Sequence, residues 1–474
     1  MGIQHIQLAS KAASSRYGLE GAAQLVNCYA EKLEDGKQAF ATYSIDGLTA
    51  FATFAGEGGV RALLAIGATL YGVSGRSVVA CDTTGTGRVI GGFAFDGHVT
   101  MARNRRQPEP QICIVCDGGV AIISGGRLYE VTDPDLPPPN SVVEIDGYFV
   151  FFCNDGRFFI SQINDGFVID GLDFATAEAN ADGGVRAAVR GRELVLLGTR
   201  SIEFWTNNGD ADFPFGRVHS IDVGCLCGGS VQTVEATLYF IAHDGTVRTL
   251  NGYQPARISD HTIERLIADE PDKAGISSMS WQERGHSFYA ISGSTFTAVF
   301  DATTGLWHKR QSYQVKRWRA DAYALFDGRH VFGDYATGKL YLSSADATDE
   351  DGAPIVCVNQ CPTVHAFPMR VRWNALYLDI IPATILTGAA TDETSTSKPR
   401  MVKIMVAFSH DGGRTFGGEQ IADAAIVGSR VERVRPLRRL GLVPQGGRIV
   451  RLSWMASDVR GVVAMSADTV KVAV

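Results

Sequence analysis

The feature that most constrains this chain is a short β-hairpin pattern that recurs through its middle. The clearest copy lies within Ile145–Gly166, where the apolar runs Tyr148–Cys153 and Arg157–Gln162 flank Asn154-Asp155-Gly156. Asp-Gly between apolar runs favours a hairpin, because glycine accepts the positive φ of a tight turn. An isolated hairpin is only marginally stable in water, so this unit must pack against others.

Six further segments show the same pattern of strand, Gly- or Asp-containing turn and strand. They are Leu70–Cys81, Val120–Val131, Glu193–Asn207, Thr237–Leu250, His286–Phe300 and Arg329–Ser343. Most are separated by enough residues for another pair of short strands. A period of roughly 40–50 residues with four strands per unit is typical of propeller blades. We therefore predict an all-β fold with a β-propeller of six or seven blades; a sandwich of unrelated β-meanders is the alternative.

The length and composition indicate a folded chain of two domains. A chain of 474 residues exceeds a typical single core. Its content of 45% hydrophobic and 20% charged residues is that of an ordinary globular protein, and its net charge of −7 argues against a protein that coats nucleic acid. No signal peptide is visible and no apolar run reaches the roughly 18 residues of a membrane span. We expect synthesis in the cytoplasm and no membrane span.

The domain prediction follows the extent of the blade pattern. The expected parts are an extended N-terminal arm (1–40), the propeller (41–345) and a smaller C-terminal β-sandwich-like domain (346–474) with a mobile polar insertion near 387–398. The ends of a ring must meet, so we expect an N-terminal strand to complete the last blade. One helix is predicted over Asp260–Asp269, with Asp260 as its cap and an apolar stripe beyond it.

The nine cysteines predict neither a metal site nor a disulfide framework. Cys113 and Cys116 form a CxxC pattern, but Ile114 and Val115 between them continue a strand. The two thiols would then point to opposite faces, whereas a structural zinc site needs two pairs, each with a turn between its cysteines. We interpret the cysteines as free, buried thiols and predict no metal and no cofactor.

One motif resembles a known carbohydrate-active fold. Ser409, Asp411, Gly413, Thr415 and Phe416 fit the Asp box of sialidase propellers, which there is a structural hairpin turn remote from catalysis. A glycosidase would also need a paired set of carboxylates, which no repeat supplies. We therefore predict no catalytic residues and no enzyme activity; a carbohydrate-binding or carbohydrate-active propeller is the alternative function.

Two basic clusters are the remaining candidates for contact residues. The candidates are Lys316, Arg317, Arg319, Arg433, Arg435, Arg438 and Arg439. Alternate residues of a strand share a face, so Arg433 and Arg435 are expected to project together. Such rows can contact DNA phosphates or acidic residues of a neighbouring subunit. We favour subunit contacts, because the chain as a whole is acidic and the clusters lack the interleaved aromatics of base-stacking sites.

Several stretches, taken in order, resemble one viral family. Gln24–Glu31 followed by Asp46-Gly47-Leu48 is similar to the opening of many phage tail and connector proteins. The segments that resemble packaged-DNA stabilisation proteins of short-tailed phages are Ser201–Trp205, Ile258–Ile267, Asp411–Gln420 and Arg438–Leu452. Their order and spacing hold over nearly the whole length.

The resemblance implies a tail hub, or nozzle, in the phage virion. Such proteins form a homohexameric tube below the portal and its adaptor, carry tail fibres or spikes and hold the tail plug or needle. They retain packaged double-stranded DNA and conduct it during ejection. We expect an acidic or neutral lumen that does not bind DNA, with the arginine clusters turned toward neighbouring subunits. A monomeric propeller scaffold is the further alternative.

Overall fold

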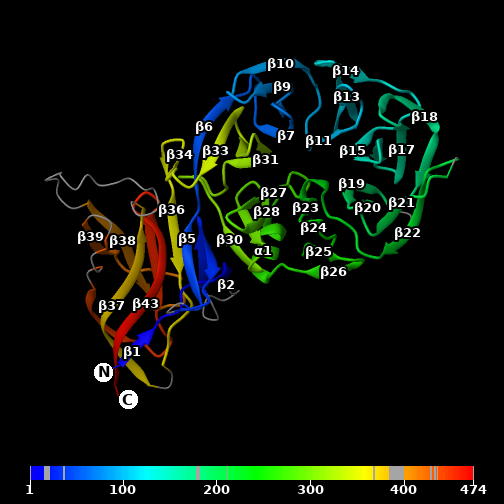
Figure 1. Cartoon of the computed structure of the whole chain (residues 1–474). Helices are drawn as coiled ribbons and strands as arrows, with labels where there is room; N and C mark the ends of the chain where they lie inside the picture. The colour runs from blue at the N-terminus through cyan, green and yellow to red at the C-terminus, as the bar shows by residue number, and fades with distance from the viewer. Residues whose placement is uncertain are drawn as a thin grey trace.

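A ring of β-sheets with a β-sandwich beside it forms this molecule (Figure 1). The computed structural model describes residues 2–14, 22–35, 38–177, 182–210, 212–366, 369–383, 400–427, 430–431, 434 and 436–472. The predicted insertion near 387–398 lies outside this part of the chain. The ring is a β-propeller of seven blades, each built from four antiparallel strands; five blades are separate four-stranded sheets, and the other two are parts of larger sheets. The predicted propeller fold is therefore confirmed, and the blade number is the larger of the two expected.

The first six blades follow one another along the chain. Blade 1 consists of β7 (Val60–Ile66), β8 (Thr69–Ser74), β9 (Ser77–Asp82) and β10 (Gly87–Gly92). Blade 2 consists of β11 (Thr100–Arg103), β12 (Ile112–Cys116), β13 (Gly119–Ser124) and β14 (Arg127–Val131). Blade 3 consists of β15 (Pro139–Ile145), β16 (Tyr148–Cys153), β17 (Arg157–Gln162) and β18 (Asp165–Thr176). Blade 4 consists of β19 (Gly184–Arg190), β20 (Glu193–Gly198), β21 (Ile202–Asn207) and β22 (Phe215–Ile221). Blade 5 consists of β23 (Gln232–Val234), β24 (Thr237–Ile241), β25 (Val247–Asn251) and β26 (Gln254–Arg257). Blade 6 consists of β27 (Ser277–Glu283), β28 (His286–Ser292), β29 (Thr297–Asp301) and β30 (Leu306–Lys309).

Blade 7 closes the ring with a strand from the N-terminal part of the chain. It consists of β31 (Ala320–Phe326), β32 (Arg329–Asp334), β33 (Lys339–Ser344) and β6 (Gly47–Thr53). Leu48 of β6 pairs with Ser343 of β33, and Thr53 pairs with Lys339. The expectation that an early strand completes the last blade is confirmed. The short pair β34 (Asp349–Glu350) and β35 (Ala353–Pro354) extends this sheet beyond β6.

The blades are held together by side chains that alternate between the two faces of each sheet. In β16, Phe149 and Phe151 pack against blade 2, whereas Val150 and Phe152 pack against blade 4. This is the two-residue period of a strand that is buried on both faces. In β12, Cys113 joins the cluster toward blade 3 and Cys116 the cluster toward blade 1. The two thiols point to opposite faces, as predicted.

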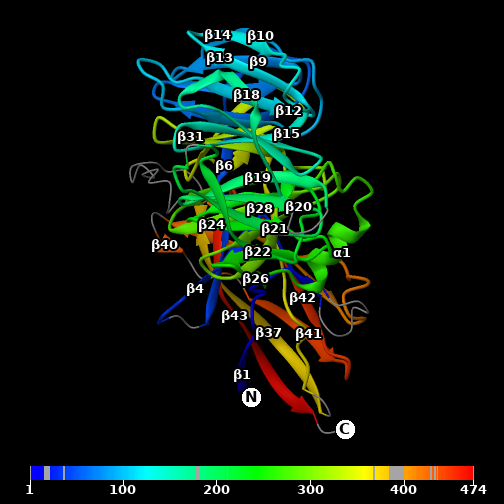
Figure 2. The same ribbon diagram turned by 90° about the vertical axis from the view of Figure 1, so that its right-hand side faces the viewer.

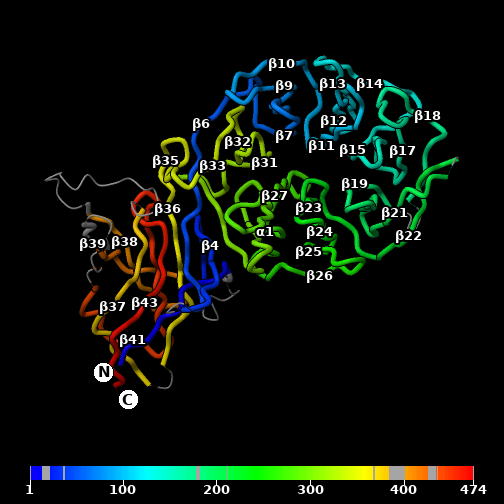
Figure 3. The backbone as a smooth tube through the Cα atoms, in the orientation of Figure 1, coloured from blue at the N-terminus to red at the C-terminus, as the bar shows by residue number. Residues whose placement is uncertain are grey.

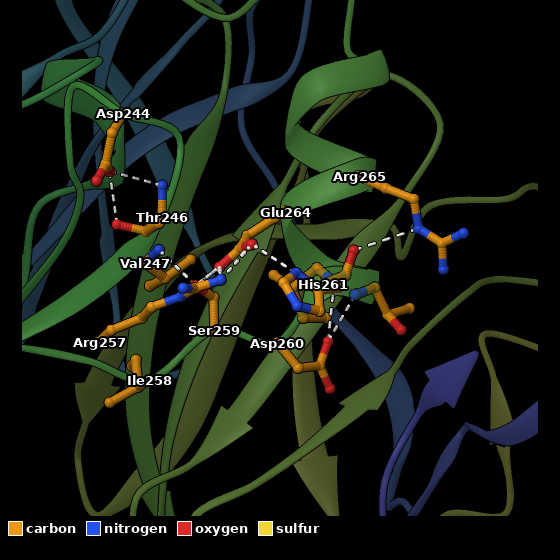
Figure 4. A network of polar contacts seen from close by, with 12 residues as sticks. Asp244, Thr246, Val247, Arg257, Ile258, Ser259, Asp260, His261, Glu264 and Arg265 are labelled. Atoms are coloured by element: carbon orange, nitrogen blue, oxygen red, sulfur yellow. Dashed lines mark hydrogen bonds and ion pairs between the residues drawn. The ribbon is translucent and has the colours of Figure 1, made fainter. Parts of the chain in front are cut away.

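The α-helix α1 (His261–Asp269) covers part of blades 5 and 6. Asp260 caps it by accepting hydrogen bonds from the backbone N–H groups of Thr262 and Ile263 (Figure 4). Ile263 and Ile267 are fully buried among apolar side chains of both blades. The predicted helix and its cap are confirmed. A turn of 3₁₀ helix, Gly228–Ser230, precedes β23.

The second part of the molecule is a sandwich of two sheets. One sheet contains β1 (Gly2–His5), β4 (Cys28–Lys32), β5 (Phe40–Ser44), β37 (Arg370–Pro382), β41 (Leu437–Val443) and β43 (Val459–Val472). The other contains β2 (Ala13–Ser14), β3 (Ala22–Val26), β36 (Val356–Gln360), β38 (Arg400–Ser409), β39 (Gln420–Val427), β40 (Arg430–Val431) and β42 (Ile449–Met455). Trp373 and Met465 of the first sheet and Val406 and Trp454 of the second share one core.

The N-terminal strands are built into the sandwich beside C-terminal strands (Figure 3). β1 pairs with β43, and β5 pairs with both β4 and β43. β3 lies between β36 of the sandwich and β30 of blade 6, so one sheet runs from the propeller into the sandwich. Both ends of the described chain lie at the tip of the sandwich that is far from the ring (Figure 1). The sequence-based division at residues 40 and 345 stays a prediction.

Candidate functional surfaces

The innermost strands of the seven blades surround an axial cavity of about 960 Å³. Its charged lining includes Arg61, Arg103 and Arg186 as well as Glu144, Asp272 and Asp321. Glu144 accepts a hydrogen bond from Gly147 N–H at 2.8 Å, and Asp321 accepts one from Arg317 at 2.7 Å. Burial lowers the pKa of Arg186 to about 10. Asp272 accepts a hydrogen bond from the Gly275 N–H at 3.0 Å. The cavity thus combines cationic and anionic groups, and each of these three carboxylates is hydrogen-bonded within the chain.

A loop from blade 2 reaches across one end of this cavity. His98, just before β11, lies with its Nε2 2.8 Å from the carbonyl oxygen of Ala274, which precedes β27 of blade 6. Its ring also covers Gly229 so closely that a Cβ on this glycine would lie 2.2 Å from the ring. Arg61 holds the loop by donating to the carbonyl oxygens of Phe95 (2.8 Å) and Gly97 (2.7 Å). These contacts join opposite sides of the ring.

Buried charged groups join the propeller to the sandwich. Asp46, between β5 and β6, accepts hydrogen bonds from Arg460 of β43 at 2.8 Å and from Arg284 of blade 6 at 2.7 Å. Arg460 is only 2% exposed. Burial, followed by the neighbouring carboxyl of Glu283, raises the pKa of Asp46 to about 6. Because a buried charge needs a partner, these contacts fix the two parts in one arrangement.

The first predicted basic cluster lies in the connection between blades 6 and 7. Arg317 pairs with Asp321 and lies over the ring of Tyr335 at 4.1 Å. Arg319 lies 3.7 Å from Glu350. The guanidinium groups of both arginines are therefore engaged within the chain. Lys316 is exposed. This cluster leaves only the lysine available to a partner.

The second predicted cluster lies partly outside the described residues. Arg433 and Arg435 are among those that the structure does not describe, so their predicted common direction stays a prediction. Arg438 and Arg439 are exposed on β41, an edge strand of the sandwich. The structure adds basic residues that sequence reasoning did not single out. These are Arg370 and Arg372 of β37 and Lys471 of β43, all exposed.

The signal for the added residues was present in the sequence as an alternation. Arg370 and Arg372 are exposed, whereas Val371 and Trp373 between and after them are buried. This pattern predicts a strand with one face in a core and one face in water. The sequence did not reveal that β41 and β43 lie on either side of this strand. The basic residues of β37, β41 and β43 therefore lie near one another because these three strands are neighbours in the sheet.

The Asp-box residues form one hairpin turn between β38 and β39. Asp411 accepts hydrogen bonds from the backbone N–H and the hydroxyl of Thr415 and from the Ser409 hydroxyl. These hydrogen bonds hold its pKa well below the usual value. Gly413 has a φ of 87°, and the guanidinium of Arg451 lies 4.1 Å from the ring centre of Phe416. The carboxylate is occupied by its own turn, which is a structural arrangement.

Large apolar side chains are exposed on the outer edge of blades 2 and 3. They are Tyr129, Ile163, Phe167, Val168, Leu172 and Phe174. Leu172 has 85% of its surface exposed. The rings of Tyr129 and Phe167 touch edge to face, with centroids 5.6 Å apart, so the patch continues from β14 to β18. Contiguous exposed apolar residues of this kind mark interaction sites.

In the described ranges, no group of three or more His, Cys, Asp or Glu side chains is placed to hold a metal ion. No helix in the same part of the chain is long and apolar enough to cross a membrane. All nine cysteines are free and buried.

The ring and its contacts define a β-propeller protein with an attached sandwich. The sequence profile of the family described as "Bacteriophage P22 Gp10, beta-propeller" matches residues 21–347, which include the whole ring. The chain belongs to this family of phage structural proteins. The resemblance to packaged-DNA stabilisation proteins is thereby confirmed.

Comparison with known structures and curated proteins adds only general likenesses. The WD40 β-propeller domain of Doa1 is 13% identical with a TM-score of 0.43, covering 63% of this chain and 97% of that one. The β-propeller domain of Cps50 (Swd1) from Myceliophteria thermophila is 13% identical with a TM-score of 0.44, covering 63% of this chain and 99% of that one. No curated protein sequence matches this chain.

Proposed function

We propose that this protein is the tail hub, or nozzle, of a short-tailed phage. Six copies form a tube below the portal–adaptor complex, retain the packaged DNA and conduct it during ejection. The observation that carries this proposal is the family match across the whole ring. The protein acts as a structural part of the virion tail, assembled in the host cytoplasm, and not as an enzyme.

The features of the single chain support a rigid building block. Seven blades closed by β6 and β33, together with the buried contacts of Asp46 and Arg460, join both ends of the chain into one body. A structural element under the pressure of packaged DNA requires such a body, because a hinge between its parts would open the tube. Tail fibres or spikes and the tail plug or needle are the further partners of this hub.

Measuring the mass of the protein alone and on its connector tests the proposal. The purified chain is mixed with the purified portal–adaptor complex, and size-exclusion chromatography with light scattering reports the number of bound copies. We expect six copies per connector. Particles assembled without this protein are expected to package DNA and then lose it. Particles that keep and eject their genome normally without it contradict the proposal.

A further inference from the structure

Two surfaces at distant places in the molecule are complementary in charge and both contain exposed apolar groups. The blade-edge surface is the apolar patch on β14 and β18 with the charged residues around it. The sandwich face is the outward side of β37, β41 and β43. Figure 1 and Figure 2 both show the blade edge and the sandwich tip far apart. One copy therefore cannot bring its own two surfaces together.

The blade-edge surface is acidic around its apolar centre. Carboxylates outnumber arginines along it: Glu130, Asp133, Asp135, Asp165, Asp170 and Asp173 stand against Arg106, Arg127 and Arg157. Two of these arginines are engaged locally, since Arg106 lies 3.4 Å from Asp165, and Arg157 pairs with Asp155. Leu172 lies between Asp170 and Asp173 in the sequence, and burial followed by the charge of Asp170 raises the pKa of Asp173. A cationic partner would offset this negative charge while covering the leucine.

The end of the sandwich face nearest the tip has the opposite charge, whereas the exposed Asp379 lies further along β37. Register places Arg372 beside Leu442 of β41, and Arg370 beside Val472 of β43. Cross-strand partners share one face of a sheet, so these four side chains project together. All four are exposed, with Leu442 at 42% and Val472 at 37%. Within the described part of the chain, neither arginine makes an ion pair.

We propose that the blade-edge surface of one copy docks on the sandwich face of the next copy. This inference rests on the proposed function and names the contact that builds its ring. The two surfaces differ, so the contact is heterologous, and repeating it closes a ring when the rotation between copies permits. Leu172 packs against Leu442 and Val472 at the centre, while Asp170 and Asp173 face Arg370 and Arg372. Complementary charge fixes the partner and the register of such an interface.

Charge reversal on each surface tests the contact. The propeller-side variant carries Asp170→Arg and Asp173→Arg, and the sandwich-side variant carries Arg370→Glu and Arg372→Glu. Each is expected to lower the apparent association constant of ring assembly on the portal–adaptor complex roughly tenfold or more. The chain with all four changes restores complementarity in every contact, so we expect it to assemble again. Mass photometry counts the copies per connector.

Two controls separate the contact from effects on folding. The variant with Arg192→Glu and Asp269→Arg reverses exposed charges outside both surfaces and is expected to assemble as the natural sequence does. Leu172→Ser removes apolar contact without changing charge and is expected to weaken assembly while the thermal unfolding midpoint stays the same. Circular dichroism verifies the fold of every variant.

The outcomes distinguish this inference from the function on which it rests. If the natural chain forms rings and both reversed variants form them equally well, the inference is overturned and the proposed function stands. If the reversed variants fail and the fourfold variant does not recover, the inference is also overturned. If the natural chain forms no ring on the connector, the proposed function fails and takes this inference with it.

Discussion

At the start of α1, one carboxylate satisfies two backbone donors that the helix itself leaves unpaired. Asp260 accepts from Thr262 N–H at 2.9 Å and from Ile263 N–H at 3.1 Å. Asp260→Ala is expected to lower the free energy of unfolding by about 1 kcal/mol. Urea unfolding followed by circular dichroism measures the loss. Asp269→Ala at the other end of the helix is the matched control and should cost nothing, because an acid there opposes the helix dipole. Equal losses would contradict the role of the cap.

A buried histidine near the junction predicts a pH dependence of stability. The Nδ1 of His286 lies 2.8 Å from Asp301, and its Nε2 lies 3.8 Å from Glu31. The hydrogen bond to Asp301, more than the nearby charges, raises the pKa of His286 above its usual value of 6.5. Its stabilisation is therefore complete below about pH 6.5 and is lost as pH rises through the raised pKa.

The expected result is that His286→Asn removes this loss of stability above pH 6.5. Denaturant unfolding of both proteins between pH 6 and 9 measures the slopes. His308, which packs beside Tyr29 as His286 does, has a pKa lowered by burial, and it acts in the opposite direction at lower pH. His261→Asn is the matched control, because His261 is almost fully exposed. A natural protein with no slope above pH 6.5 would disprove the argument.

At the scale of single residues, the sequence predicted local bonds but not buried charges. The Asp260 cap and the Asp411 turn involve residues within four positions of each other, so their patterns are visible in the chain. Arg460, by contrast, bonds to Asp46, more than four hundred positions away. Nothing near Arg460 in sequence indicates that it is buried, because its partner arrives only when the sandwich closes on the propeller.

At the scale of elements, strand β6 closes the ring by pairing with β33, and it also packs against the sandwich. Leu48 is fully buried in the core that blade 7 shares with the sandwich. Leu48→Ala is expected to cost about 2–5 kcal/mol of unfolding free energy, because the cavity left in a packed core cannot fully collapse. Denaturant titration provides the value. The neighbouring Thr49→Ala, on the exposed side of the same strand, is the control and should stay within about 0.5 kcal/mol. Comparable effects at both positions would mean that β6 is not packed as described.

The blades show how far periodicity determines a fold. Each of the seven hairpins read from the sequence lies in a different blade, because a hairpin depends on its own turn and alternating strands. In six blades it is the pair of middle strands, whereas Val120–Val131 is the outer pair β13–β14 of blade 2. The weak, short strands β11 and β23 were not visible as hairpin arms. The pairing of β3 with β30 and β36 could not be predicted from the sequence either, because it depends on tertiary contacts alone.

At the scale of the whole molecule, the proposed function requires a strong tube through which DNA can still move. In the proposed hexamer, six copies with a formal net charge of −7 each carry −42 together. Of the predicted basic residues that the structure describes, Arg317 and Arg319 are engaged within the chain, and Arg438 and Arg439 lie at the edge of the sandwich. This distribution favours an acidic or neutral bore, with basic residues used between copies.

DNA binding by the assembled ring gives the last prediction. A wall that contacts about 6–10 phosphates gives a slope of roughly −5 to −9 when log K is plotted against log salt. We expect the ring on its connector to bind a linear duplex more weakly than about 10⁻⁴ M at physiological salt, the upper end for non-specific DNA-binding proteins. Fluorescence anisotropy over a salt series measures both quantities.

Lys316→Glu and Arg438→Glu separate the two roles of the basic residues. A phosphate contact would reduce the slope by about one for each residue changed, whereas a subunit contact would change the assembly and leave DNA binding as it was. A steep slope that these changes reduce would place DNA, and not a neighbouring copy, against the arginines.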